Sequence, residues 1–406
     1  MDTKSILIWG AGRIGRGFLA DLFQTSGYHI TFIDISEELI GQLKRAGHYT
    51  VVRAEGTGKR DDLVIHSYDA FSTTQVEEVA RALADTDLMA LAVFPRDFPV
   101  VVTQMLPGLQ RRYTLRPHVP LDIILCTNLA HAALEFSAAL RTVLPEDLHA
   151  YVEQQVGIVE SLVIRMVAEP PAAERMRDPL LVWTNGYAEF PVDRHAFKGA
   201  VPSVLGLRLV DDMRAEETRK LYTYNTFHAA LAYWGALYDY EHIVDCLADA
   251  RVRMEALGAL SESSQALQAE YHFPRIEMTR WNEGVVQQTN NPTLGDRVSR
   301  QGADPLRKLR RDDRLIGPIL LARKHAIPTP HLIRATAAAF LYRNPCDAGV
   351  IAIQECVAQR GIEAAVREIC QLSPSEEDIV TAVVAAYAEI KDMRPDLDAT
   401  ERANVS

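Results

Sequence analysis

The sequence predicts an α/β protein in which a doubly wound parallel sheet is followed by an all-α C-terminal domain. Three observations lead to this fold class. A short apolar run, Ile6 to Trp9, enters a glycine-rich turn directly. Further apolar runs then alternate with helical patterns up to about residue 200, as in a parallel sheet with crossover helices. Beyond that point the patterns are helical.

The first domain is expected at residues 1–200. A run as short and apolar as Ile6 to Trp9 suits a strand buried on both faces. Helical spacing then places Phe18, Leu19, Leu22 and Phe23 on one side. Further strands are expected at residues 30–33, 88–94 and 121–125, with a helix at 74–83 before the second of them.

The second domain is expected at residues 201–395, followed by a polar tail at 396–406. We expect helices at residues 215–237, 240–257, 315–325, 332–342 and 346–359. The last helix has the clearest start. Ser373, Pro374 and Glu376 have the spacing of an N-cap residue, a first helical residue and a capping-box partner.

The glycine turn predicts a dinucleotide site. Gly10, Gly12 and Gly15, with Arg13 and Ile14 between them, form G-x-G-x-x-G between a strand and a helix. This is the Rossmann-type arrangement, in which the helix N-terminus receives the pyrophosphate. Asp34 ends the next predicted strand, where a carboxylate binds the adenosine ribose hydroxyls and repels a 2′-phosphate. We therefore expect NAD as cofactor rather than NADP.

Composition excludes several classes of protein. The 406 residues carry 43 Lys and Arg against 54 Asp and Glu, a net charge of −11, which argues against nucleic acid and anionic membranes as partners. We find neither a signal peptide nor an apolar run long enough to span a membrane, so a cytoplasmic location is expected. The five cysteines are scattered without metal-ligand spacing, so no metal is expected.

A second polar cluster lies in the first long helix of the C-terminal domain. On an ideal α-helix, Lys220, Asn225 and His228 fall within an arc of roughly 140°. A lysine with a pKa lowered by burial can take the proton of an alcohol, an asparagine can donate to the developing alkoxide, and a histidine can orient the substrate. A solvated helix face with a chance polar cluster would show the same spacing.

The pattern K-x-x-x-x-N-x-x-H after a dinucleotide fold resembles the polyol-specific long-chain (mannitol dehydrogenase) family. Within it, the chain is most similar to the mannitol-1-phosphate 5-dehydrogenase branch. Four stretches of the sequence carry the resemblance, namely residues 10–18, 197–211, 219–228 and 304–316. The resemblance implies that Lys220 is the general base, that Asn225 and His228 bind the reacting oxygen, that Asn128 lies near the cofactor, and that no metal is used.

The chain also departs from the family pattern. Position 13 is Arg where the phosphate branch usually has Asn. In the segment resembling V-D-R-I-V-P, Ile164 replaces the Asp and Ala168 replaces the Pro, and Glu160 stands where some members have an Asn. Arg165, from the same segment, is a candidate for substrate binding.

A basic stretch bears on the identity of the substrate. Residues 297–314 contain seven Lys and Arg against three Asp. Arg307, Lys308 and Arg314 are therefore candidates to bind a substrate phosphate, since Arg suits bidentate phosphate binding. A solvated loop with internal salt bridges is the competing interpretation.

Together these observations predict a metal-independent, NAD-dependent oxidoreductase, a monomer or homodimer, that interconverts a sugar alcohol phosphate and a ketose phosphate. The pair would be of the mannitol 1-phosphate and fructose 6-phosphate type. One alternative is a dehydrogenase of an unphosphorylated polyol or a sugar acid, of the mannitol 2-dehydrogenase or hexuronate reductase type. Another is a non-catalytic NAD-binding regulator, which would have no use for the Lys220 cluster.

Overall fold

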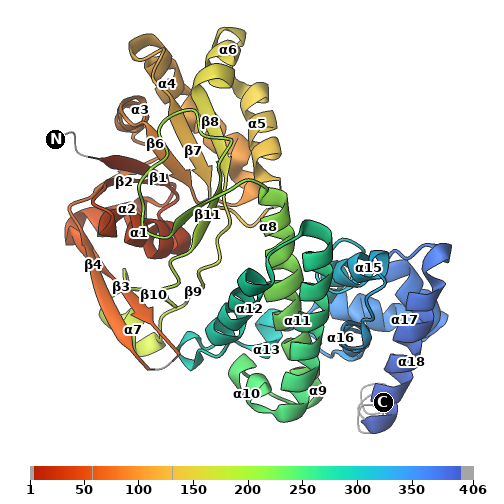
Figure 1. Cartoon of the computed structure of the whole chain (residues 1–406). Helices are drawn as coiled ribbons and strands as arrows, with labels where there is room; N and C mark the ends of the chain where they lie inside the picture. Colours follow the sequence, from red (N-terminus) through yellow and green to blue (C-terminus); the bar gives the residue numbers. More distant parts are fainter. Residues whose placement is uncertain (1–3, 57, 130, 395–406) are drawn as a thin grey trace. The chain divides into compact units, whose positions relative to one another are not determined.

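The computed structural model describes residues 4–56, 58–129 and 131–394 (Figure 1). The chain divides into two compact units, Met1–Glu217 and Thr218–Ser406, and the boundary falls inside helix α8 (Met213–Lys220). The tail expected at 396–406 lies outside the described residues.

The first unit is built on a six-stranded parallel sheet, which confirms the predicted fold class. Its strand order is β5-β2-β1-β6-β7-β8, and every neighbouring pair is parallel. The strands are β1 (Ser5–Trp9), β2 (His29–Asp34), β5 (Asp69–Ser72), β6 (Leu88–Leu91), β7 (Leu121–Leu125) and β8 (Val156–Glu160). The chain builds outward from β1 on one side and then returns to its other side, so the strand order reverses between β1 and β6.

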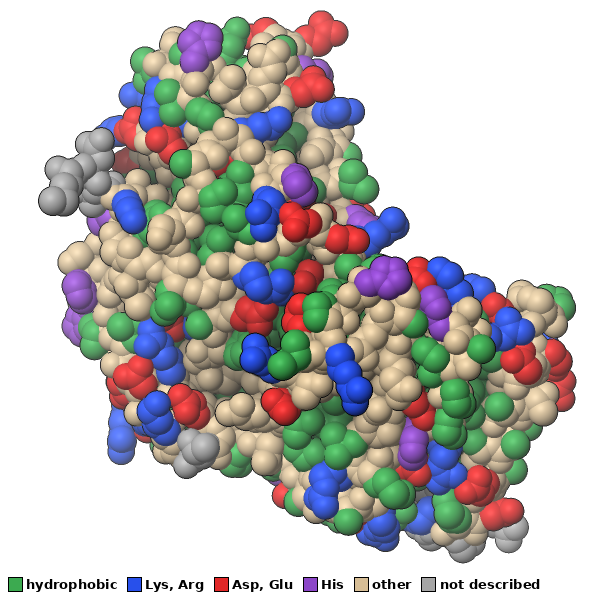
Figure 2. Space-filling model, viewed as in Figure 1, with side chains coloured by type: hydrophobic (Ala, Val, Ile, Leu, Met, Phe, Trp, Pro, Cys, Tyr) green, Lys and Arg blue, Asp and Glu red, His purple; other side chains and the backbone are tan. Residues whose placement is uncertain are grey.

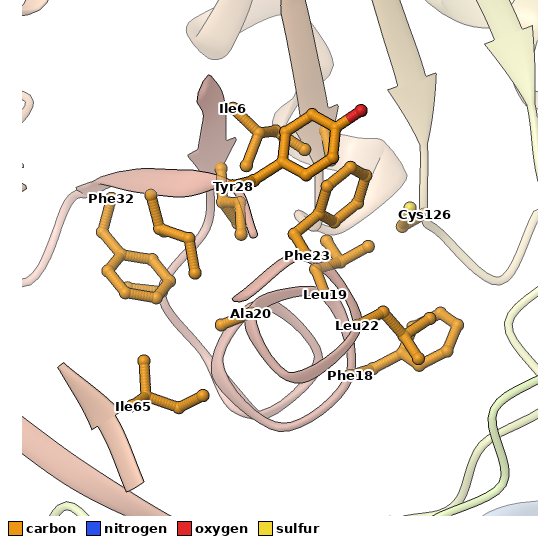
Figure 3. Packing of buried hydrophobic residues seen from close by; sticks show 14 of the residues in the cluster. Ile6, Phe18, Leu19, Ala20, Leu22, Phe23, Tyr28, Phe32, Ile65 and Cys126 are labelled. Carbon is orange, nitrogen blue, oxygen red and sulfur yellow. The ribbon is translucent and has the colours of Figure 1, made fainter. Parts of the chain in front are cut away.

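Helices cover both faces of this sheet, because alternate strand residues point to opposite sides. Ile6 and Ile8 pack in one core with π turn η1 (Gly15–Leu19) and helices α1 (Ala20–Thr25) and α2 (Glu37–Ala46). Figure 3 shows Phe18, Leu22 and Phe23 on this helical segment, with Phe23 directed toward Ile6 and Tyr28. Leu7 and Trp9 pack in the other core, with α3 (Val76–Asp85), α4 (Phe98–Leu115), α5 (Ala132–Val143) and α6 (Glu146–Gln155).

Two smaller sheets complete the first unit, and the sequence did not predict most of their strands. The order β4-β3-β10-β9 joins β3 (His48–Ala54), β4 (Arg60–His66), β9 (Val167–Ala168) and β10 (Val182–Thr184). Strand β11 (Phe190–Asp193) pairs in parallel with β12 (Leu207–Val210). Because of this pairing, residues beyond 200 remain part of the first unit.

The second unit is helical, as predicted, and is organised around α9 (Thr226–Leu237). This helix is buried on nearly all sides, which is typical of a core helix. The other helices of the unit are α10 (Ile243–Ala248), α11 (Ala250–Tyr271), α12 (Arg275–Thr289), α13 (Val298–Gly302), α14 (Pro305–Lys308), α15 (Ile316–Lys324), α16 (Pro330–Leu341), α17 (Ala348–Ile369) and α18 (Glu377–Met393).

Two helix boundaries show how local chemistry acts. The single helix expected at 240–257 is two helices, because the Asp249 carboxylate accepts from the backbone N–H groups of Arg251 and Val252 and starts α11 afresh. The capping box of Ser373 and Glu376 is confirmed. It encloses a short 3₁₀ turn (Pro374–Glu376) that leads into α18.

Candidate active site

The glycine turn lies at the carboxyl end of β1, at the point where the strand order reverses. Doubly wound sheets bind ligands in this crevice. Gly10 has a φ of +102°, and a Cβ there would lie 2.4 Å from the carbonyl oxygen of Ala92. A Cβ on Gly15 would lie 1.9 Å from the Gly10 carbonyl oxygen. The fold itself therefore requires both of these glycines.

Gly12 is a glycine that the protein interior does not require. A Cβ at this position would meet no protein atom within 4 Å. Gly12 and Arg13 are exposed and Ile14 is half-buried, at the N-terminus of the helical segment that follows. The open space fits a ligand whose phosphates approach the backbone and the free N–H groups of that helix.

Asp34 lies at the carboxyl end of β2, the neighbour of β1. One oxygen of its carboxylate accepts the N–H of Ala11 in the glycine turn at 2.7 Å, and the other accepts the N–H of Ser36 at 2.8 Å. A carboxylate offers about four acceptor sites, so capacity remains for ribose hydroxyls. Asp34 thus ties the turn to β2 while facing the same edge of the sheet.

Asn128 is exposed in the bend that follows β7. It lies at the same carboxyl edge as the glycine turn, since all six strands are parallel. Glu160, at the end of β8, has a different contact. Its carboxylate accepts the N–H of Ala133 at 2.9 Å, in the first turn of α5. A carboxylate at that position also complements the positive end of the helix dipole.

Arg165 lies in the interior of the first unit and its donors are used by the protein. Its guanidinium forms an ion pair with the fully buried Asp21 and donates to the carbonyl oxygens of Gly17 at 3.0 Å and Tyr187 at 2.7 Å. Burial lowers the pKa of Arg165, and the Asp21 charge opposes this effect. These contacts join the first helical segment to the chain between β8 and β11, so the structure shows Arg165 as a packing residue rather than part of an open site.

In the second unit, a π turn brings the predicted polar residues into line. The long helix predicted at 215–237 is present as α8, the π turn η3 (Leu221–Asn225) and α9. A π turn closes with i→i+5 hydrogen bonds, so residues five apart are about one turn apart along the helix. Lys220 and Asn225 therefore lie on one side of the helix, and His228 follows Asn225 by three residues on that same side.

The residues that contact this turn and His228 come from α12 and were not predicted from the sequence. The indole N–H of Trp281 donates to Thr223 Oγ1 at 2.8 Å, inside the π turn. Thr289 Oγ1 lies 3.0 Å from Nε2 of His228. Burial lowers the pKa of His228 to about 4, so the ring is neutral at pH 7. Trp281 and Thr289 lie about 60 residues further along the chain than their partners, so no local sequence pattern predicted these contacts.

Each arginine predicted to bind phosphate pairs with a carboxylate of the protein. Arg307 contacts Asp304 at 2.7 Å and Asp313 at 3.0 Å, and Arg314 contacts Asp313 at 2.7 Å. Lysines, arginines and carboxylates are also interspersed over the face of the molecule seen in Figure 2. Arg307 lies in α14, is half-exposed and has ion pairs within the protein, which the interpretation with internal salt bridges predicts.

Lys308 differs from these arginines. It is only 4% exposed, and its ammonium donates to the backbone carbonyl of Gln301. No carboxylate of the described chain forms an ion pair with it. Burial, together with the charges of Arg314 and Arg307, lowers the pKa of Lys308 to about 7. The pKa of His228 is lowered mainly by burial, and the charges of Arg300, Arg314 and Lys308 lower it further.

Comparison with known proteins identifies the family. The model of the mannitol dehydrogenase Rossmann domain matches residues 4–206, and that of the mannitol dehydrogenase C-terminal domain matches residues 212–394. The chain belongs to the mannitol dehydrogenase family. It is accordingly an NAD-dependent polyol dehydrogenase, as the glycine turn, Asp34 and the Lys220 cluster predict.

Two solved structures share this fold over nearly their whole length. A D-sorbitol dehydrogenase in substrate-free form matches with a TM-score of 0.82 at 15% identity, covering 98% of this chain and 95% of that one. The Pseudomonas fluorescens mannitol 2-dehydrogenase, in a ternary complex with NAD and D-mannitol, matches with a TM-score of 0.68 at 16% identity. That match covers 100% of this chain and 95% of the other.

Two further observations concern metals and membranes. In residues 4–56, 58–129 and 131–394, no group of three or more His, Cys, Asp or Glu side chains is arranged to bind a metal ion. The cysteines are free thiols. No helix in the described part of this mannitol dehydrogenase family member is both long and apolar enough to cross a membrane.

Proposed function

We propose that this enzyme interconverts a sugar alcohol phosphate and a ketose phosphate, with Lys220 as general base, Asn225 as donor to the reacting oxygen and His228 orienting the substrate. The alignment of these three side chains by the π turn supports this assignment of roles. When bound at the glycine turn, NAD would provide the chemistry of accepting a hydride from the carbinol carbon. Gly10, Gly12 and Gly15 with Arg13 and Ile14 would hold its pyrophosphate, Asp34 its ribose, and Asn128 lies at the same edge.

The protein's own part in the reaction is to move one proton and stabilise one oxygen. Oxidation requires the Lys220 amine to accept the hydroxyl proton, and ketone reduction requires the ammonium to return it. The side-chain N–H of Asn225 stabilises the charge that develops on the oxygen between these two states.

The charges around His228 support a phosphorylated substrate. Arg300, Lys308 and Arg314 lower the pKa of this histidine, while Asp296 alone among its main neighbours raises it. Three cations thus act on the histidine against one carboxylate, and burial without a carboxylate partner leaves Lys308 with half of its charge near pH 7. An anionic group beside Lys308 would restore that charge, which favours binding of a phosphate.

A specific observation favours an unphosphorylated polyol as second candidate. Arg300, Arg307 and Arg314 are already paired with Asp296, Asp304 and Asp313. A phosphate would have to compete with these carboxylates, whereas a neutral polyol would leave the pairs intact.

NADH formation on matched pairs of polyols and polyol phosphates decides between the candidates. We expect a higher kcat/KM for the phosphorylated member of each pair and a loss of that preference in Lys308→Met. A preference for the free polyol, unchanged in Lys308→Met, would establish the second candidate. Turnover of a sugar acid would point to the other branch of the family, and NAD binding without turnover on any member would indicate a regulator.

A further inference from the structure

The environment of His228 determines which of its ring nitrogens carries the proton. The ring is buried against α12, and in the described chain its hydrogen bond is to Thr289, with 3.0 Å between Nε2 and Oγ1. Thr289 Oγ1 also lies 2.7 Å from the carbonyl oxygen of Val285, one turn back along α12. A threonine hydroxyl has a single proton to donate.

Only one placement of that proton satisfies both contacts. Two oxygen atoms 2.7 Å apart repel each other unless a hydrogen lies between them, and a carbonyl oxygen has none to offer. The Thr289 proton therefore points to Val285. The contact between Oγ1 and Nε2 must then use the proton of Nε2.

We propose that Thr289 is a positioning residue that holds His228 as the Nε2–H tautomer, so that Nδ1 accepts a hydrogen bond from a substrate hydroxyl. The contact between Nδ1 and a substrate hydroxyl rests on the proposed function, whereas the tautomer of His228 does not. In a neutral ring the nitrogen without the proton is an acceptor only. The ring is neutral at pH 7, because burial and the surrounding Arg300, Lys308 and Arg314 outweigh the opposing charge of Asp296.

This tautomer assigns a distinct task to His228. An acceptor cannot stabilise an alkoxide or a ketone oxygen, both of which also only accept. The reacting hydroxyl has one proton, which goes to Lys220. His228 Nδ1 must therefore take its hydrogen bond from a second hydroxyl, such as that on the carbon next to the oxidised one. A vicinal diol unit is then the chemical feature that the site recognises.

The tautomer is measured by ¹⁵N NMR of the full-length enzyme with labelled histidines, without substrate. The His228 signals are those lost in His228→Gln. We expect one protonated nitrogen, Nε2, and one lone-pair nitrogen, Nδ1, at pH 7. Thr289→Val should abolish this single pattern, and Thr289→Ser should restore it. A protonated Nδ1 in the wild type, or an unchanged pattern in Thr289→Val, would overturn the proposal.

Kinetics give a second measurement. If Thr289 had only a structural role, its replacement would lower kcat/KM equally for the full substrate and for an analogue lacking one hydroxyl. With the best polyol from the panel, the wild type should lose about 100-fold in kcat/KM for the analogue lacking the neighbouring hydroxyl, because Nδ1 is then left without a donor. Thr289→Val should lose about 10-fold on the full substrate but little on the analogue, with NADH affinity unchanged. Equal losses on both substrates would contradict the role assigned to His228. Absence of polyol turnover would refute the proposed function and leave the NMR result intact.

Discussion

The burial of Lys308 affects stability and function in opposite directions, and its effect on stability can be measured. Its pKa falls from 10.5 to about 7 on folding. Between those values the unfolded chain binds a proton that the folded enzyme does not, so this group's contribution to stability rises with pH. The slope is about 1.4 kcal/mol per pH unit, and the full penalty at pH 7 is at most about 5 kcal/mol.

Lys308→Met removes this penalty. We expect the variant to gain stability over the wild type at pH 7.5, and the gain to shrink by about 2–3 kcal/mol at pH 9.5. Urea unfolding at both pH values measures the difference, in which the other titrating groups cancel. Lys324→Met is the matched control, because the Lys324 side chain is 62% exposed and its removal takes no charge out of the protein interior. If the difference in free energy of unfolding between Lys308→Met and the wild type is the same at both pH values, the burial of Lys308 does not lower its pKa.

Three further predictions concern the cofactor and metal independence. Gly12→Ala should leave the melting temperature unchanged and weaken NAD binding, whereas Gly15→Ala should destabilise the fold; calorimetry and NADH fluorescence titration separate the two. Asp34→Ala should lower kcat/KM for NAD and relax the preference over NADP, and equal use of both cofactors by the wild type would contradict the role of Asp34. Turnover should survive exhaustive chelation, and loss of activity restored by zinc would show that Lys220 is not the base.

The elements that could be predicted from the sequence are those marked by a pattern within a few neighbouring residues. Strands β1, β2, β6 and β7 of the main sheet were predicted, and the glycine turn and Asp34 marked the ends of the first two, because local spacing and glycine conformation carry that information. Strands β5 and β8 were not predicted. Strand β4 escaped because its residues Arg60, Asp61 and Asp62 are polar and exposed, so no apolar run marks it.

The sequence indicated the residues of the candidate site but not the residues that contact them. Lys220, Asn225 and His228 occur within one window, whereas the π turn that aligns them depends on Trp281 and the histidine's hydrogen bond depends on Thr289. Both partners come from a helix distant in sequence. Charge counting likewise showed a basic stretch but not that Asp313 pairs with both Arg307 and Arg314, which is a matter of tertiary geometry.

Lys220→Ala tests most directly whether the residues aligned by the π turn carry out the chemistry. Single-turnover NADH formation from the preferred polyol should fall by about 10²–10⁴-fold, with NADH affinity nearly unchanged, because the cofactor residues belong to the first unit. In the wild type, oxidation should rise with pH through one ionisation and ketone reduction should fall through one, and both dependences should disappear in the variant. Wild-type turnover in Lys220→Ala would show that the cluster is only a helix surface.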